Sequence, residues 1–407
     1  MSLDITKFEK FIPYFLIAVL FFIPISASLK SIFIILSAVG LLLTPAYRNQ
    51  LPFVFSEHWC KSALALFLVV IFACYWSAAN YHTRFMFIDK YSKLLYLPIF
   101  AIGFQQQSIR RLGIYVFLFS MVITCIMSFI LDTGDPTTPG RVFHDHVTTG
   151  YMMAFATYLS AWLMIRAQGR RAILLMLLTL LFSYQLIFVN TGRIGYLLYF
   201  VLMLLFLIQT LPWKYVGVGI ICFCTLFSLC AYNSHALSSR VHKAFADLNH
   251  YQQGDKVTPV GIRLVFHAYA KTLFLSKPWK GHGTGSFSHF YQQYNTAPEY
   301  SKIMEPHSQY WLIASEYGLL GLVALFYFFS SLIVAAFRLE EMKPIMLAML
   351  VCFFTSNLLD SQLLHSNVGY LFIIFCALCL GEALEQRIQR SPVRLQPNII
   401  PLKTTTA

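Results

Sequence analysis

The sequence predicts an all-α fold: a polytopic transmembrane helical bundle of about 12 spans with a small helical cap on one face. Of the 407 residues, 58% are hydrophobic and only 12% are charged, whereas soluble domains carry roughly a quarter charged residues. Apolar runs long enough to cross a hydrocarbon layer recur along the whole chain. They lack the alternation of barrel strands, so we expect helices, which satisfy their own backbone hydrogen bonds.

The apolar runs fall into two groups separated by one long polar segment. Residues 1–232 are expected to hold spans one to nine, 233–309 one large loop, 310–384 spans ten to twelve, and 385–407 a disordered basic tail. The first run, from Phe11, should remain as a span because no small-residue cleavage site follows it. The expected spans are 11–28, 31–45, 62–79, 91–104, 113–131, 147–165, 172–190, 194–211, 215–232, 310–336, 345–359 and 367–384.

The distribution of lysine and arginine predicts the orientation. With both termini cytoplasmic, the inner segments hold 16 of the 30 basic residues, the short outer loops hold six, and the large loop holds eight. This bias follows the positive-inside rule, so the large loop should face outward, which in a bacterium is the periplasm. The net charge of +13 is explained by this placement, and we exclude nucleic acid as a partner.

The large loop has a composition of its own. Its stretches from Ser239 and from Gly261 carry apolar residues at three- and four-residue spacing, which predicts amphipathic helices lying on the membrane face. The loop also holds seven of the twelve histidines and several aromatic residues, a composition suited to sugar stacking and interfacial anchoring.

Two arginines stand at predicted helix starts. Arg193 follows the short polar break Asn190-Thr-Gly, and Arg263 follows Pro259-Val-Gly. A guanidinium beside a helix N-terminus can bind a phosphate in a bidentate manner. The alternatives are an arginine that reaches toward lipid headgroups at 193 and a solvated surface charge at 263. If both face one outward cavity, they form a clamp for a diphosphate.

His307 is the candidate catalytic base. It follows Pro306 at the entrance of the predicted tenth span, where a neutral imidazole can accept a proton. The alternative is an interfacial histidine that bonds a backbone carbonyl. Glu316 lies inside the same span, where a carboxylate needs a partner, and it is expected to support the site.

Further candidates surround these residues. The turn Gly281-His282-Gly-Thr-Gly lacks the lysine of a nucleotide-binding loop, so we expect it to shape the cap near the site. Arg141 and His146, in an earlier outer loop, are placed at the rim of the same cavity. A metal bound by His144-Asp-His146 is a weaker interpretation.

The order and spacing of these elements resemble the O-antigen ligase and polymerase superfamily. The resemblance covers most of the chain, and the stretch from Gly281-His-Gly-Thr-Gly through Pro-His307-Ser-Gln-Tyr to Glu316-Tyr-Gly-Leu-Leu-Gly is its most specific part. Relatives often have asparagine where this chain has Ser308, which leaves the role of that position open.

The resemblance implies a metal-independent, inverting glycosyltransferase of the bacterial inner membrane that needs no cofactor. Its donor would be a glycan on undecaprenyl diphosphate, and membrane lipids would surround it. Arg193 and Arg263 would hold the diphosphate, while His307 would deprotonate the acceptor hydroxyl.

Several activities remain open. Ligation of O-antigen onto a lipid A-core acceptor is the first expectation, because the chain is compact and has no large domain after its last span. Polymerisation of repeat units is the second and protein O-glycosylation the third. A transporter or lipid-binding membrane protein is the non-enzymatic alternative, although the ionisable residues gather at the outer face and not at the midplane.

Overall fold

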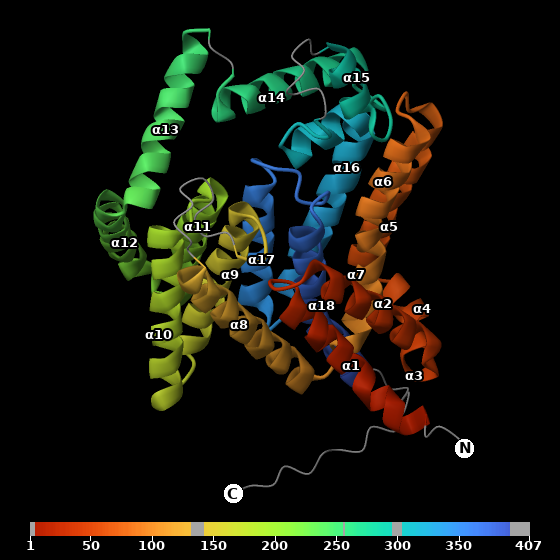
Figure 1. The fold of residues 1–407 in the computed structure, drawn as a ribbon. Helices are drawn as coiled ribbons and strands as arrows, with labels where there is room; N and C mark the ends of the chain where they lie inside the picture. The colour runs from red at the N-terminus through yellow and green to blue at the C-terminus, as the bar shows by residue number, and fades with distance from the viewer. Residues whose placement is uncertain (1–4, 132–141, 255–256, 295–302, 391–407) are drawn as a thin grey trace, which may run out of the picture.

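The computed structural model describes residues 5–131, 142–254, 257–294 and 303–390, and within them all regular structure is helical. Eighteen α-helices run from α1 to α18 (Figure 1). The predicted all-α fold is therefore confirmed.

The N-terminal half of the molecule is a bundle of helices of unequal length. α9 packs between α10 and α11, and α1 packs against α2 and α8. The elements are α1 (Ile5–Phe22), α2 (Ala27–Leu43), α3 (Pro45–Arg48), α4 (Leu51–Phe55), α5 (His58–Ala73), η1 (Cys74–Trp76), α6 (Tyr81–Ser92), η2 (Lys93–Leu95), α7 (Tyr96–Gly103), α8 (Gln107–Ile130), α9 (His146–Met164), α10 (Arg170–Tyr184), the π-helical turn η3 (Gln185–Val189), α11 (Arg193–Thr210) and α12 (Trp213–Asn233).

Seven helices in the described residues are long and apolar enough to cross a membrane, and the count rises to eight if the pair 27–43 and 45–55, bent by 80°, forms one span. The chain is thus a multi-pass helical membrane protein. The apolar helices at 11–22 and 343–356 are shorter, and the predicted span 91–104 is divided among the end of α6, η2 and α7. The total of twelve crossings stays a prediction.

The large loop folds into helices, as its periodicity predicts. It contains α13 (His235–Gln252), α14 (Pro259–Ser276) and α15 (Ser286–Tyr294). Thr258 caps α14 through a hydrogen bond from the Gly261 amide, and Pro259 fits the first turn. α13 contacts α14, α14 packs against α16, and together they cover one end of the bundle (Figure 1).

The C-terminal helices are α16 (Gln309–Phe337), α17 (Lys343–Ser356) and α18 (Ser366–Arg390). The predicted span 310–336 is broken at Gly318, whose backbone has a φ of 61° and a ψ of −152°. The freed amide of Leu319 donates to the Pro278 carbonyl at 2.7 Å. A Cβ at Gly318 would lie 2.5 Å from that same oxygen, so this break requires glycine.

The turn Gly281-His-Gly-Thr-Gly285 fills the break in α16. The amides of His282 and Gly283 donate to the carbonyls of Ser315 and Glu316, and a Cβ at Gly281 would lie 2.4 Å from the Glu316 backbone. The glycine-rich turn therefore joins the helical cap to the interior of α16.

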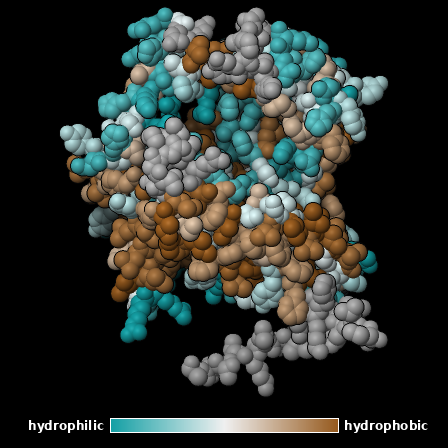
Figure 2. All heavy atoms as spheres, viewed as in Figure 1, coloured by the Kyte–Doolittle hydropathy of each residue, from teal (hydrophilic) through white to brown (hydrophobic). Residues whose placement is uncertain are grey.

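Polar and apolar surface separate along the molecule. Hydrophilic residues surround a hollow in the half that carries α13, α14 and α15, whereas hydrophobic residues cover much of the other half (Figure 2). This is the distribution expected where one half lies in lipid and the cap lies outside it.

The structure corrects in part where the predicted disordered C-terminal tail begins. α18 continues to Arg390, and Glu385 forms an ion pair with Arg110, so the predicted disordered tail does not begin at 385. Residues 391–407 of that tail lie outside the described residues.

Candidate active site

Arg193 is held at the start of α11 by the polar break before it. Asn190, which is buried, accepts a hydrogen bond from the Gly192 amide at 2.6 Å and donates to the His146 carbonyl at 3.1 Å. A Cβ at Gly192 would lie 2.6 Å from that carbonyl. The break thus fixes the first turn of α11 against the start of α9, as the sequence indicates for position 193.

The guanidinium of Arg193 is paired across to the helical cap. Its Nη2 lies 3.4 Å from Oδ2 of Asp247 on α13, and the two side chains are 30% and 14% exposed. The ion pair is partly open to solvent, so an incoming anion can compete with Asp247 for the arginine. The sequence did not indicate Asp247.

Arg263 lies on the second turn of α14, half-buried. One turn later on the same helix, His267 donates from Nε2 to the His307 carbonyl at 3.3 Å. The structure therefore brings Arg263 to the part of α14 that contacts the candidate base. The diphosphate clamp formed by Arg193 and Arg263 stays a prediction.

His307 stands directly before Ser308, the N-cap residue of α16. Among the described residues it is the one non-glycine residue with a positive φ, 54°. Its ring stacks on Phe266 of α14 with centroids 5.8 Å apart, and its Nδ1 donates to Oδ1 of Asp360 at 3.2 Å. A strained backbone that is fixed by several contacts is common at functional sites.

Asp360 is positioned by the loop between α17 and α18. Within this loop, the Leu363 amide donates to Oε1 of Gln309 at 3.0 Å, and Lys93 donates to the Leu363 and His365 carbonyls. The Ser361 amide donates to Asp360 itself. The loop is therefore tied to the first residue of α16, two residues after His307.

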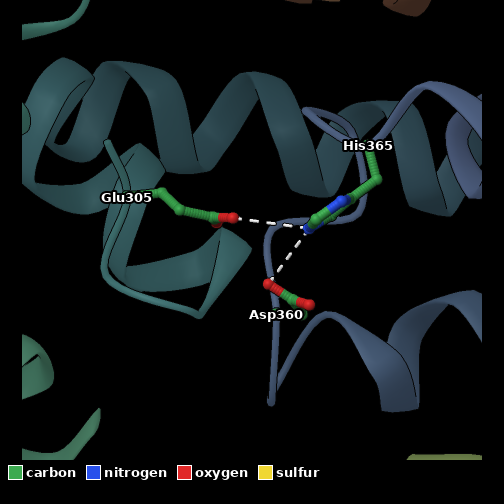
Figure 3. Close-up of side chains that lie close together, drawn as sticks. All are labelled: Glu305, Asp360 and His365. Carbon is green, nitrogen blue, oxygen red and sulfur yellow. Dashed lines mark ion pairs between the residues drawn. The ribbon is translucent and has the colours of Figure 1, made fainter. Parts of the chain in front are cut away.

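Asp360 also belongs to an ion cluster with Glu305 and His365 (Figure 3). His365 Nε2 lies 3.2 Å from Asp360 Oδ1 and 3.4 Å from Glu305 Oε1. Although burial opposes it, contact with both histidines holds the pKa of Asp360 well below its ordinary value. Burial would lower the pKa of His365, but the contacts with Asp360 and Glu305 raise it to about 10.

The same three residues carry the atom types of metal ligands. One oxygen each from Glu305 and Asp360 and a nitrogen of His365 lie within 4.8 Å of one another. With no metal bound, the raised pKa makes His365 a cation at neutral pH. Its imidazolium then supplies the positive charge that the two carboxylates need.

Two secondary candidates, His282 and Glu316, make contacts that hold the fold together. His282 is buried, and its Nε2 donates to the Leu273 carbonyl at 3.0 Å, which ties the glycine-rich turn to the end of α14. Glu316 is fully buried and accepts from the Phe287 amide at 3.3 Å, at the start of α15. Among the described residues, neither side chain forms a hydrogen bond or ion pair with His307.

The remaining outer-loop candidates lie near Arg193 or outside the described residues. His146 opens α9, and its carbonyl receives the Asn190 bond. The neighbouring Asp145 caps α9 through the Val147 and Thr148 amides, and His144 Nε2 lies 2.9 Å from the Ile23 carbonyl. These contacts give His144 and Asp145 structural roles in place of a metal site. Arg141 lies outside the described residues.

One comparison with known proteins supports the interpretation of this region. Residues 178–326 match the family model described as O-antigen ligase. This segment contains Arg193, Arg263 and His307, the three principal site candidates. No curated protein matches the chain. This match supports the resemblance of the chain to the O-antigen ligase and polymerase superfamily.

Proposed function

We propose that this protein is an O-antigen ligase, which transfers a glycan from undecaprenyl diphosphate to a hydroxyl of a lipid A-core acceptor at the outer face of the bacterial inner membrane. The observation that carries the proposal is the His307–Asp360 pair at the start of α16, in which His307 lies inside the segment that matches the family. The helical cap above it carries Arg263 on α14 and Asp247, the partner of Arg193, on α13.

The geometry suits His307 as a general base. A hydrogen bond from Nδ1–H to Asp360 selects the tautomer in which Nε2 carries the lone pair. Nε2 has no hydrogen-bond partner among the described residues, so it is available to an acceptor hydroxyl. Asp360, Glu305 and the His365 cation together leave one net negative charge, which stabilises the imidazolium that forms when His307 takes the proton.

The transfer then follows in one displacement. The acceptor oxygen loses its proton to Nε2 of His307 and bonds to the anomeric carbon of the glycan, while the bond from that carbon to the diphosphate oxygen breaks. Undecaprenyl diphosphate leaves with the bonding electrons, and the anomeric configuration inverts. Arg193 and Arg263 would offset the charge of the leaving diphosphate, and no metal is needed where guanidinium groups supply this charge.

The test is complementation of a gene deletion. The deletion strain receives wild-type protein or His307→Ala, and its lipopolysaccharide is run on a gel beside an assay of undecaprenyl-linked glycan. We expect the variant to lose capped core and to accumulate polymerised lipid-linked chains. Loss of long chains, with single repeat units still reaching the core, would indicate a polymerase. Unchanged glycans in the deletion would contradict both activities and favour a transporter.

A further inference from the structure

A polar pocket lies next to the loop that holds Asp360. It has a volume of about 260 Å³ and lies among α2, α6, η2 and the start of α18. Among the described residues that line it are Lys90, Lys93, Ser92, Ser366 and Asp89. We call this cavity the lysine pocket. None of the candidate catalytic residues lines it.

Two buried lysines lie at the pocket, Lys93 in its lining and Lys30 beside it. Lys93, 1% exposed, donates to the carbonyls of Leu363 and His365 at 2.7 and 3.0 Å. Lys30, also 1% exposed, lies just behind Ser366 and donates to its hydroxyl at 2.9 Å and to the Asn367 side-chain carbonyl at 2.5 Å. All of these acceptors are neutral.

Both ammonium groups flank a single aromatic ring. The Nζ atoms of Lys30 and Lys93 lie 5.5 and 5.4 Å from the centroid of Tyr370. Among the described residues, no carboxylate lies within ion-pair distance of either lysine. Buried cations are costly without a counter-charge, so this pocket favours an anion.

Two further lining groups can donate hydrogen bonds to a phosphate. The Ser366 hydroxyl accepts from Lys30 and keeps its own hydrogen to donate, and Lys90 is half-buried at the pocket. The Ser92 hydroxyl, by contrast, already donates to the Asp89 carbonyl. Ser366 is also the first residue of α18, a helix of 25 residues, whose N-terminus favours negative charge. Asp89 is the one acidic residue in the described lining, and it is exposed.

An apolar face of α2 leads away from the pocket. Ile32, Ile35, Leu36 and Val39 are 43–57% exposed and recur at three- and four-residue spacing, and Ile35 itself lines the pocket. Exposed apolar residues of this kind on a membrane helix face acyl chains. The anion is therefore expected to be the headgroup of a lipid whose chains lie along α2.

We propose that the lysine pocket binds a phosphate of the acceptor glycolipid, with the acyl chains of that lipid along α2. The assignment to the acceptor rests on the proposed function. It is favoured because Lys93 bonds the same loop that carries Asp360 and His365, which connects the pocket to the loop that holds the partner of the candidate base.

The test measures lipid retention by the purified full-length protein in detergent, using native mass spectrometry and thermal unfolding. The probes are lipid A with its phosphates, dephosphorylated lipid A, phosphatidylglycerol and inorganic phosphate. The variants are Lys90→Glu and the milder Lys90→Gln, because replacing the buried Lys93 risks unfolding. Lys271→Glu, at an exposed lysine of α14, is the matched control.

We expect the wild type and the control to retain phosphorylated lipid A at least about fivefold better than the dephosphorylated form, and Lys90→Glu to lose this preference. Equal retention of both forms, or no effect of either Lys90 variant, would overturn the phosphate site. Equal binding of phosphatidylglycerol, or protection by inorganic phosphate alone, would overturn the assignment to the acceptor.

A transfer assay separates this proposal from the proposed function. Lys90→Glu should raise the acceptor KM several-fold with little change in kcat, and His307→Ala should abolish transfer while it still retains phosphorylated lipid A. Unaltered transfer by His307→Ala would refute the proposed function without affecting the lipid-binding result. An unchanged acceptor KM in Lys90→Glu, with transfer still dependent on His307, would refute the lysine pocket alone.

Discussion

The two sides of the candidate site differ in how firmly the fold holds them. Arg193 pairs with Asp247 of α13, a helix in which Leu237 is the one buried residue of the described side chains. His307 stands instead at the start of α16, where 17 of 29 residues are buried. A well-packed helix places a side chain rigidly, whereas a helix with few buried contacts can open locally.

This difference suits the two proposed roles, proton removal by His307 and donor binding by Arg193. A general base must already lie at the right distance from the acceptor hydroxyl, and the His307–Asp360 pair is fixed by the core. The arginine side must admit a large lipid-linked donor, and a partly exposed ion pair on α13 can exchange Asp247 for the diphosphate. We therefore expect substitutions on the base side to affect kcat and those on the arginine side to affect the donor KM.

The largest effect is expected from the loss of the base itself. His307→Ala should lower kcat for glycan transfer by about 10³, with donor binding and thermal stability close to wild type. Transfer measured with purified protein and lipid-linked donor checks this. His235→Ala, at an exposed histidine on α13, is the control, and an equal loss there would contradict a specific role for His307.

The next effect concerns the partner of the base. Asp360→Asn keeps the size of the side chain but weakens the selection of the His307 tautomer, so kcat should fall by about 10². The pH–rate profile should also shift, which a purely structural defect would not produce. Partial recovery of kcat in Asp360→Glu would support this role. A change in donor KM alone would show that Asp360 acts in donor binding and not through His307.

The arginine side should respond through binding. Arg193→Lys loses bidentate contact with phosphate and should raise the donor KM about tenfold while kcat changes little. Asp247→Asn removes the competing carboxylate and should leave that KM unchanged or lower it. Arg48→Lys, at the other end of the bundle, is the control. A raised KM in Asp247→Asn would show that the ion pair positions the arginine and does not compete with the donor.

The smallest effect is a pH dependence of stability. The pKa of His365 is raised to about 10 in the folded protein. The stability that charged His365 contributes is therefore fully present below its unfolded pKa near 6.5, and it is lost as pH rises through about 10. His365→Gln should lower the melting temperature by about 1–3 °C at pH 6.5. The difference from wild type should vanish by about pH 10.5, and a constant difference across this range would contradict the ion cluster.

Local signals allowed much of the molecule to be predicted. Asn190-Thr-Gly before Arg193 and Pro306 before His307 mark helix starts through the residues next to them, and both starts are found. The break in α16 was missed because Gly318 lies within a continuous apolar run. Its left-handed backbone is selected by the distant turn at Gly281, and hydropathy carries no information about such a contact.

The base-side cluster was missed for the same physical reason. Asp360 is 53 residues from His307 in sequence, and residues 357–365 follow an apolar run closely enough to resemble the end of a span. The polar residues Asn357, Asp360 and Gln362 between two spans were the available signal. They show that the loop is polar, but only the fold shows which histidines share Asp360.

The most direct test of the central claim is the product balance of purified protein given undecaprenyl-diphosphate-linked glycan and lipid A-core. We predict that the wild type forms glycan-capped lipid A-core and undecaprenyl diphosphate in equal amounts without added metal, and that His307→Ala forms neither. Capping by His307→Ala at more than about a tenth of the wild-type rate, or lipid-linked glycan growing longer while the core stays uncapped, would contradict it.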